Sequence, residues 1–238
     1  MADDLDQYLS AVLIGGLEPG AIVLADYDPA WRARYDREAA TISEALGDRV
    51  RRVEHIGSTA VPGLAAKPII DILVVVQDSS QEAAYIPALE GAGYVLRVRE
   101  PGFHEHRMLR TPARDVHVHV YSTGSPEIDR QLRFRDRLRT SEADRLEYAR
   151  TKRDLASRDW KSMQYCAEAK TAVIERIMAR GDCAAAVMTG PRVRAGASAA
   201  ARPWRHSLGR RASWQGWSHG PRPARARGAT HGRRGQRS

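Results

Sequence analysis

The most constraining feature of this 238-residue chain is the stretch of residues 53–76, which reads VEHIGSTAVPGLAAKPIIDILVVV. Two apolar runs flank an elbow rich in Gly, Ser and Pro, so the stretch predicts a strand, a turn and a second strand. The second run, residues 69–76, is apolar at nearly every position, which indicates a strand buried on both faces. Asp71 lies inside this run, and a carboxylate there requires a partner, a metal ion or an open cleft.

The elbow carries residues suited to binding a phosphorylated ligand. Gly57 allows a close approach of the backbone, and Ser58 and Thr59 offer hydroxyl and amide groups to an anion. Lys67 adds a positive charge, and Asp71 adds a hard oxygen ligand that suits Mg²⁺. The alternative is an ordinary turn followed by one surface-facing aspartate, because a Gly-Ser pair alone is a weak signal.

The charge of the chain is unevenly distributed. The formal net charge is +9, but residues 181–238 contain 12 arginines and one aspartate and account for +11. Residues 1–180 therefore carry a net charge of −2, which argues against nucleic-acid binding by the folded body. The segment 181–238 lacks an apolar period and is rich in Ala, Gly, Arg, Pro and Ser, so it predicts a disordered, Arg-rich tail.

The composition also limits the environment of the chain. No run of 18 apolar residues occurs, which predicts no membrane-spanning helix and no membrane partner. The first residues are acidic and their apolar run is short, so they do not form a secretory signal, and we expect a cytoplasmic location. Cys166 and Cys183 are the only cysteines, and two are too few for a disulfide framework.

The periodicity of the remaining sequence predicts an α/β fold: a mixed sheet with flanking helices, a helical C-terminal part and one domain over residues 21–180. Residues 1–20 form a leader in which residues 3–13 have helical spacing. Asp28 is a candidate N-cap for the helix that follows it. The expected strands cover residues 21–25, 49–55, 69–76, 94–98, 107–110 and 116–121. The expected helices cover residues 30–46, 81–92, 127–139, 142–156 and 160–180.

Seven further side chains are candidates for the site. The last expected strand alternates strictly as VHVHVY, so His117 and His119 share one face and could reach one metal ion or one substrate. His55 precedes the Gly-Ser turn, where it would contact a phosphate, act as a base or simply pack at the end of the strand. Arg107 would clamp an anion through its guanidinium group or be an ordinary surface charge. Arg135 would point at the cleft and bind the ligand, or pair with its neighbours on the helix. Tyr148 and Lys152 on a later helix would either bind the ligand or make structural contacts.

The chain resembles the GrpB family, a group placed in the nucleotidyltransferase superfamily. The resemblance rests on DYDPAW at 26–31, VEHIGSTAVPGL at 53–64, AKPIIDI at 66–72, HVHV at 117–120 and FRDRLR at 134–139, and continues through Tyr148, Lys152 and residues 165–170. It covers about residues 21–180 and excludes the leader and the tail. It implies a nucleotidyltransferase-like core in which a Gly-Ser loop holds nucleotide phosphates and acids on the strands hold divalent metal.

Carried over to this sequence, the resemblance implies phosphate binding by Gly57 and Ser58. It also implies a divalent ion, Mg²⁺ or Mn²⁺, held by Asp71 with His117 and His119, of which Asp71 and His119 are the candidate catalytic residues. The second acid of the family pattern is absent, because Leu73 occupies its position. One aspartate with two imidazoles suits a single ion, and Mn²⁺ or Zn²⁺ fits that donor set better than a pair of Mg²⁺ ions.

Three functions remain open from the sequence. The first is metal-dependent transfer of a nucleotidyl or phosphoryl-containing group from a nucleotide or another phosphorylated compound to a small molecule. The second is a non-catalytic module that binds a phosphorylated ligand or assists a partner, since GrpB-like domains also occur fused to dephospho-CoA kinase. The third is nucleic-acid binding through the Arg-rich tail, against which the charge of the body argues. The missing second acid favours the second function over a two-metal version of the first.

Overall fold

The computed structural model describes residues 2–18, 23–160 and 162–188, and its core is a five-stranded mixed sheet. The strands lie in the spatial order β1 (Val50–Ile56), β2 (Ile70–Val76), β5 (Val116–Ser122), β4 (His106–Arg110) and β3 (Val95–Glu100). β2 and β5 run parallel, and the other neighbouring pairs are antiparallel. The expected mixed sheet with flanking helices is confirmed.

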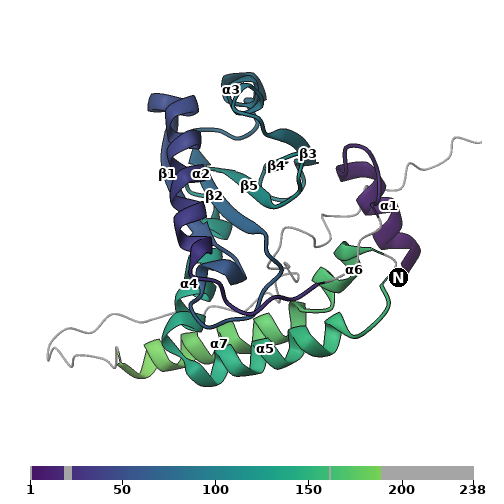
Figure 1. Cartoon of the computed structure of the whole chain (residues 1–238), viewed down its shortest axis with the longest axis vertical. Helices are drawn as coiled ribbons and strands as arrows, with labels where there is room; N and C mark the ends of the chain where they lie inside the picture. The colour runs from purple at the N-terminus through teal and green to yellow at the C-terminus, as the bar shows by residue number, and fades with distance from the viewer. Residues whose placement is uncertain (1, 19–22, 161, 189–238) are drawn as a thin grey trace, which may run out of the picture.

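Seven α-helices surround the sheet in the described part of the chain. They are α1 (Ala2–Val12), α2 (Ala30–Leu46), α3 (Ile86–Gly91), α4 (Pro126–Thr140), α5 (Glu142–Ala156), α6 (Met163–Glu168) and α7 (Thr171–Met188). Short 3₁₀ turns are η1 (Gly47–Arg49), η2 (Ser58–Ala60) and η3 (Glu82–Ala84). Figure 1 shows α2 alongside β1 and β2, and α5 and α7 side by side below the sheet.

The alternation of β2 explains how the sheet is covered on both faces. Ile70, Ile72 and Val74 belong to an apolar cluster that includes Trp31, Ile42 and Leu46 of α2. Leu73 and Val75 point to the opposite face and pack with side chains from β5 and α4. The expectation of a strand buried on both faces is therefore confirmed. Asp71 is the one half-buried residue in this otherwise buried strand.

The C-terminal helices hold the elbow that follows β1. Val61 and Leu64 of the elbow are fully buried against Phe134 of α4, Tyr148 of α5 and Ile177 of α7. Because these apolar contacts fix both ends of the turn, the helical part positions residues 57–67 relative to the sheet. The expected helical C-terminal part is thus also the support of the candidate site.

Several boundaries differ from the sequence expectation. The helix expected over residues 81–92 is divided into η3 and α3, and the helix expected over 160–180 is divided into α6 and α7. In place of the strand expected over 21–25, Ala25 forms an isolated bridge with Ala66, and residues 19–22 lie outside the described residues. Ile69, expected in the second strand, precedes β2.

The first and last helices of the described chain bear on the expected leader and tail. The expected helix in the leader is α1, whose Leu5, Leu9 and Val12 are buried against Val98 and Met108 of the sheet. α7 continues through Gly181 to Met188, whereas residues 189–238, the rest of the expected tail, lie outside the described residues. The division into leader, domain and tail stays a prediction. No helix among the described residues is long and apolar enough to cross a membrane.

Candidate functional site

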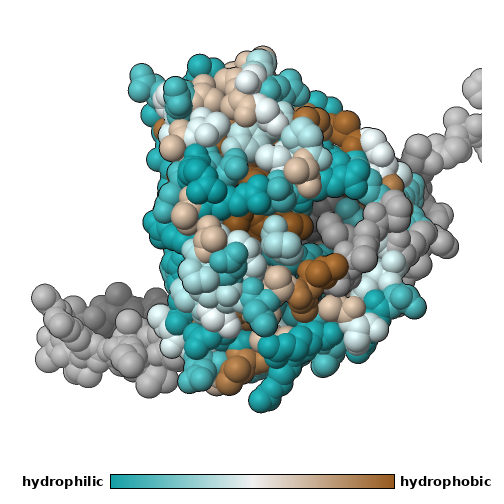
Figure 2. Space-filling model, in the orientation of Figure 1, coloured by the Kyte–Doolittle hydropathy of each residue, from teal (hydrophilic) through white to brown (hydrophobic). Residues whose placement is uncertain are grey.

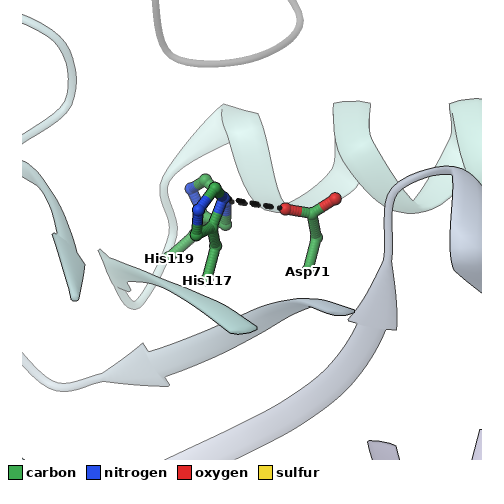
Figure 3. Close-up of side chains that lie close together, drawn as sticks. All are labelled: Asp71, His117 and His119. Carbon is green, nitrogen blue, oxygen red and sulfur yellow. Dashed lines mark ion pairs between the residues drawn. The ribbon is translucent and has the colours of Figure 1, made fainter. Parts of the chain in front are cut away.

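Asp71, His117 and His119 meet on one face of the sheet, as the sequence predicts (Figure 3). β2 and β5 are parallel neighbours in a register that pairs Asp71 with His117 and Leu73 with His119. The imidazoles point toward the Asp71 carboxylate, with Oδ1 3.5 Å from Nδ1 of His117 and 3.6 Å from Nε2 of His119. One ligand atom from each residue lies within 4.8 Å of the others.

This arrangement fits a single divalent ion. Two ligands bound tetrahedrally at about 2.0–2.1 Å from an ion stand roughly 3.4 Å apart, close to both oxygen–nitrogen distances. Two imidazoles and one carboxylate suit Mn²⁺, Zn²⁺ or Fe²⁺ and leave further coordination positions open for a substrate. Burial alone would raise the pKa of Asp71, but the adjacent imidazoles of His117 and His119 outweigh it and hold this pKa well below its usual range.

The turn after β1 lies against the Asp71 carboxylate. Gly57 adopts φ 70°, a left-handed conformation that glycine accepts readily. Ser58 and Thr59 follow in η2, and the Thr59 hydroxyl donates to the carbonyl of Ile69, 3.1 Å away. This bond joins the turn to the segment that leads into β2, so the loop and the carboxylate are positioned together.

A cavity of about 310 Å³ opens in front of the triad. It is lined by Gly57, Ser58 and Thr59 from the elbow, together with all three triad residues. In the face drawn in Figure 2, hydrophilic side chains predominate, and apolar residues are visible in the hollow between the upper part and the helices below. The sequence prediction that the turn lies at the rim of the Asp71 site is confirmed.

Basic side chains dominate the charge of this cavity. Its lining includes six of them, namely Lys67, Arg97, Arg110, Arg114, Lys152 and Lys170. The only carboxylates among the described lining residues are Asp71 and Glu18. Glu18 accepts two bonds of 2.7 Å from Arg110, and these hydrogen bonds lower its pKa to about 2. An anionic ligand is therefore the natural complement of the cavity.

The position of the missing second acid offers no ligand. Leu73 is completely buried and packs with Ile56, Val75 and Tyr121 in the apolar cluster beneath the triad. Glu18, the other carboxylate of the described lining, is engaged by Arg110. A two-ion centre needs several carboxylates to hold ions about 4 Å apart, and this set of residues does not supply them.

Two lysines of the cavity were not selected from the sequence as site residues. The sequence leaves both ligand binding and ion pairing open for Lys152 on α5, and it indicates no role for Lys170, just before α7. Both are only 7 % exposed. The available signal was their place on otherwise apolar helix faces, for example between the buried Tyr148 and Leu155 on α5.

His55, a predicted phosphate contact, is absent from the cavity lining. Its ring stacks on Tyr35 of α2 with centroids 4.6 Å apart, and its Nε2 lies 3.1 Å from the Thr59 hydroxyl. Burial is the main cause that lowers the pKa of His55, to about 4. His55 is thus a packed strand residue, neutral near pH 7, whose ring contacts the Thr59 hydroxyl and helps to position it.

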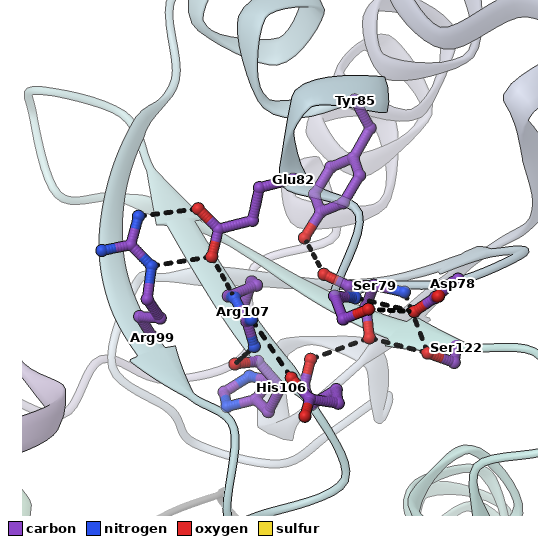
Figure 4. Close-up of polar contacts among 10 residues, drawn as sticks. Asp78, Ser79, Glu82, Tyr85, Arg99, His106, Arg107 and Ser122 are labelled. Carbon is purple, nitrogen blue, oxygen red and sulfur yellow. Dashed lines mark hydrogen bonds and ion pairs between the residues drawn. The ribbon is translucent and has the colours of Figure 1, made fainter.

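Arg107, a predicted anion clamp, is also absent from the described lining of the cavity and is engaged by protein groups instead (Figure 4). Its Nε donates to Glu82 at 2.6 Å, and its two terminal nitrogens donate to the His106 carbonyl and to Glu105. Figure 4 also shows Arg99 on the same Glu82 carboxylate. The bonds to Glu82 join β3 and β4 to η3, the turn before α3, so they are structural contacts.

Arg135 of α4 likewise binds protein groups and lies outside the described lining. One terminal nitrogen donates to Glu54 at 2.8 Å and to the carbonyl of His55 at 3.0 Å, while the remaining donors bind Asp136. The guanidinium thereby ties α4 to β1. Its neighbour Arg139 donates to the carbonyl of Ala60, which holds the end of the elbow.

Behind the triad, a chain of buried polar groups begins at His119. Its Nδ1 lies 3.1 Å from Nε2 of His106, whose Nδ1 lies 2.9 Å from Glu100. His106 and Glu100 are 2 % and 1 % exposed. If His119 binds an ion through Nε2, its Nδ1 carries a proton and donates to His106, which in turn donates to Glu100. Carboxylate–histidine pairs of this kind orient metal-ligating histidines.

Fold and site together define a mixed α/β domain in which a strand-borne Asp-His-His cluster opens on a basic cavity. The chain belongs to the GrpB protein family, which matches residues 21–180. A UPF0157 protein of Halalkalibacterium halodurans is 50 % identical over 179 residues, covering 74 % of this chain and 92 % of the relative. A UPF0157 protein of Streptomyces coelicolor is 51 % identical over 172 residues, covering 72 % of this chain and 90 % of the relative.

A solved structure of similar fold comes from the same family. The crystal structure of the conserved protein GrpB from Enterococcus faecalis matches 66 % of this chain and 96 % of its own, with a TM-score of 0.60 and 36 % identity. The sequence-based assignment to the GrpB family and the expected arrangement of sheet and helices are both confirmed.

Proposed function

We propose that the cavity binds one divalent cation together with a nucleotide or another phosphorylated small molecule, and that the domain transfers a nucleotidyl or phosphoryl-containing group to a small-molecule acceptor. The observation that carries this proposal is the Asp71–His117–His119 cluster at the rim of a basic cavity, beside the Gly57–Ser58 turn. Asp71 and His119 are catalytic in this proposal because, with His117, they would place the ion against the reacting group.

The proposed roles follow from the chemistry of each group. The ion would withdraw charge from the phosphoryl oxygens and favour attack on phosphorus. Ser58 and the backbone amides of the turn would bind phosphate oxygens, and Lys67 would offset their charge. In the transfer, a bond forms between the acceptor oxygen and phosphorus, and the bond from phosphorus to the leaving oxygen breaks. The leaving group takes the electron pair, and the acceptor releases its proton to solvent.

A second candidate function is supported by the buried Leu73. Because the described lining offers no carboxylate besides Asp71 and the Arg110-bound Glu18, the same domain could bind a phosphorylated ligand without turnover, or assist a partner. Ligand and ion binding are common to both candidates. The distinguishing observation is therefore turnover of a labelled nucleotide in the presence of Mn²⁺, Zn²⁺ or Mg²⁺.

The test uses the intact chain in thermal-shift and calorimetric titrations of nucleoside triphosphates with each ion. A ligand that binds only the folded state at 100 times its Kd stabilises it by about 2.7 kcal/mol, which is readily measured. Asp71→Asn should remove the ion-dependent part of this stabilisation. Asp36→Asn, a change to an exposed helical carboxylate paired with Arg32, is the matched control and should change nothing.

The outcomes separate the candidates. Turnover that requires an ion and is lost in Asp71→Asn supports group transfer. Ion-dependent ligand binding without turnover under any metal supports the binding module. If neither ions nor phosphorylated ligands shift the melting temperature of the wild-type chain, both candidates are wrong.

A further inference from the structure

The basic residues of the cavity have an unusual composition. The chain contains 38 basic residues, of which only four are lysines, at positions 67, 152, 161 and 170. Three of these four, Lys67, Lys152 and Lys170, line the same cavity, and Lys161 lies outside the described residues. Nearly all other basic residues of the chain are arginines, so the lysines are concentrated at this cavity. The ammonium group is a compact point charge with three donors, whereas guanidinium is a broad planar fork.

Lys170 is the most informative of the three. Its side chain is 93 % buried yet lines the cavity, and within the described part of the chain no carboxylate or carbonyl accepts a hydrogen bond from its Nζ. The ammonium group lies at the wall of a cavity, in a residue with little access to bulk water, so an anion in the cavity would stabilise its charged form. Such a group is typical of a binding site that a ligand completes.

The neighbouring lysines increase the positive potential. Lys152 is also 7 % exposed; its Nζ donates to the carbonyl of Ala65 and lies 5.0 Å from the centre of the Tyr148 ring. The charge of Lys67 acts on Lys170, and that of Lys170 acts on Lys152. Burial is the larger cause, and together these effects lower the pKa of Lys170 to about 8 and that of Lys152 to about 6. Each group is thus destabilised in its charged form until an anion is present.

Burial outweighs the negative charge of Asp71, which acts on Lys67 and Lys170, so the pKa of both lysines stays lowered. Asp71 is turned to His117 and His119, and Glu18 is bound by Arg110. An anion with several negative charges would favour the protonated form of all three lysines and accept hydrogen bonds from them in several directions. An oligophosphate meets both conditions, whereas a single carboxylate supplies one charge.

We propose that Lys67, Lys152 and Lys170 form an oligophosphate subsite that holds the part of the ligand remote from the transferred group. The inference rests on the proposed function in taking the ligand to be phosphorylated, and it adds where its other phosphates bind. The subsite joins the segment before β2 to α5 and the start of α7, so an oligophosphate bridges the sheet and the C-terminal helices.

The test measures binding of tripolyphosphate, pyrophosphate and inorganic phosphate to the intact chain by calorimetry in EDTA, so that no divalent ion takes part. Wild type should bind tripolyphosphate more tightly than phosphate. Lys170→Met should weaken tripolyphosphate binding at least tenfold. Arg176→Met, which removes an exposed charge on α7 outside the described cavity lining, should leave the affinity unchanged.

Melting temperatures add a readout that a merely structural role would not give. Because Lys170 has no acceptor in the described structure, Lys170→Met should raise the melting temperature of the free protein and abolish its increase on adding tripolyphosphate. Lys170→Gln provides the same comparison if the methionine variant fails to fold. Unchanged tripolyphosphate affinity in either variant, or no oligophosphate binding by wild type, would overturn the proposal.

Two further arms identify the source of the oligophosphate and isolate the subsite from the metal site. Tighter binding of ATP than of tripolyphosphate assigns the subsite to a nucleotide, and equal affinity assigns it to an oligophosphate without a base. Asp71→Asn should keep tripolyphosphate binding in EDTA while losing ion-dependent binding. If the proposed metal function is wrong but the subsite is correct, tripolyphosphate binding persists; if only the subsite is wrong, ion-dependent binding persists.

Discussion

Gly57 and Asp71 are in such close contact that a Cβ atom on residue 57 would lie 2.3 Å from Oδ2 of Asp71. Glycine is thus required at this position for two reasons: its φ is 70°, and a side chain would overlap the Asp71 carboxylate. The absence of a side chain lets the turn that is proposed to bind phosphate and the candidate metal ligand occupy adjacent positions. Any larger residue at 57 must move either the turn or the carboxylate.

Gly57→Ala should therefore destabilise the fold by about 2–4 kcal/mol, the sum of an unfavourable backbone conformation and steric overlap with Asp71. Gly63→Ala is the matched control, because Gly63 has φ 75° and no atom within 4 Å of an added Cβ. Chemical denaturation of both variants separates backbone strain from the clash. Equal losses of stability in the two variants would contradict the close packing of Gly57 on Asp71.

The pH dependence of stability should report the burial of His55. Its pKa is lowered from 6.5 to about 4, with burial as the main cause, so between these values the unfolded chain binds a proton that the folded chain does not. The contribution of His55 to the free energy of unfolding should therefore be fully present above about pH 6.5. It should be lost as the pH decreases toward 4, which lowers the free energy of unfolding by roughly 3 kcal/mol at most.

His55→Gln should flatten this decline while the buried His106, whose pKa is also lowered by burial, contributes equally to both proteins. Urea denaturation from pH 7 to 4 measures the difference between wild type and variant. If the two curves stay parallel over this range, His55 titrates normally and its buried, neutral state is wrong.

The sequence could predict the Asp71 cluster because each part has a local signal. A lone carboxylate interrupts an apolar run, and a strict alternation places His117 and His119 on one side of a strand. Their proximity further requires that β2 and β5 be parallel neighbours, although more than 35 residues separate them in the chain. The expectation that the three residues share one site came from the family resemblance, since periodicity within one strand contains no information about its neighbour.

The sequence is least informative about residues whose role depends on a distant partner. Nothing near Arg107 or Arg135 in the chain indicates that Glu82 and Glu54 engage their guanidinium groups. Conversely, Lys152 and Lys170 reach the cavity only because α5 and α7 pack beneath the elbow. Side-chain chemistry is readable from sequence, but the choice between an ion pair and a ligand contact is made by tertiary packing.

The buried chain from His119 through His106 to Glu100 should control ion affinity. Glu100→Gln keeps the size of the side chain but replaces the acid by an amide, whose oxygen is a weaker acceptor and whose NH₂ can donate to Nδ1 of His106 instead. The proton positions that leave Nε2 of His119 free then become less favoured. We expect Mn²⁺ or Zn²⁺ affinity to fall 10–100-fold. Glu105→Gln, at a 41 % exposed position, should leave the affinity unchanged.

The measurement combines calorimetry with ¹⁵N chemical shifts of the imidazoles. A change in the tautomer of His119 in Glu100→Gln, accompanied by the loss of affinity, is the expected result. Unaltered imidazole shifts and unaltered affinity would show that Glu100 does not act on the metal site through His106.

Arg107 provides the last prediction, because the sequence and the structure assign it different roles. Its side chain is 5 % exposed and bound to Glu82, so Arg107→Met should lower the free energy of unfolding by about 1–3 kcal/mol and leave the affinity for phosphorylated ligands unchanged. Arg99→Met is the matched control: Arg99 binds the same carboxylate but is 50 % exposed, so its loss should cost less than about 1 kcal/mol. Urea denaturation and tripolyphosphate titration of both variants decide the matter. A fall in ligand affinity with unchanged stability would restore Arg107 as an anion clamp.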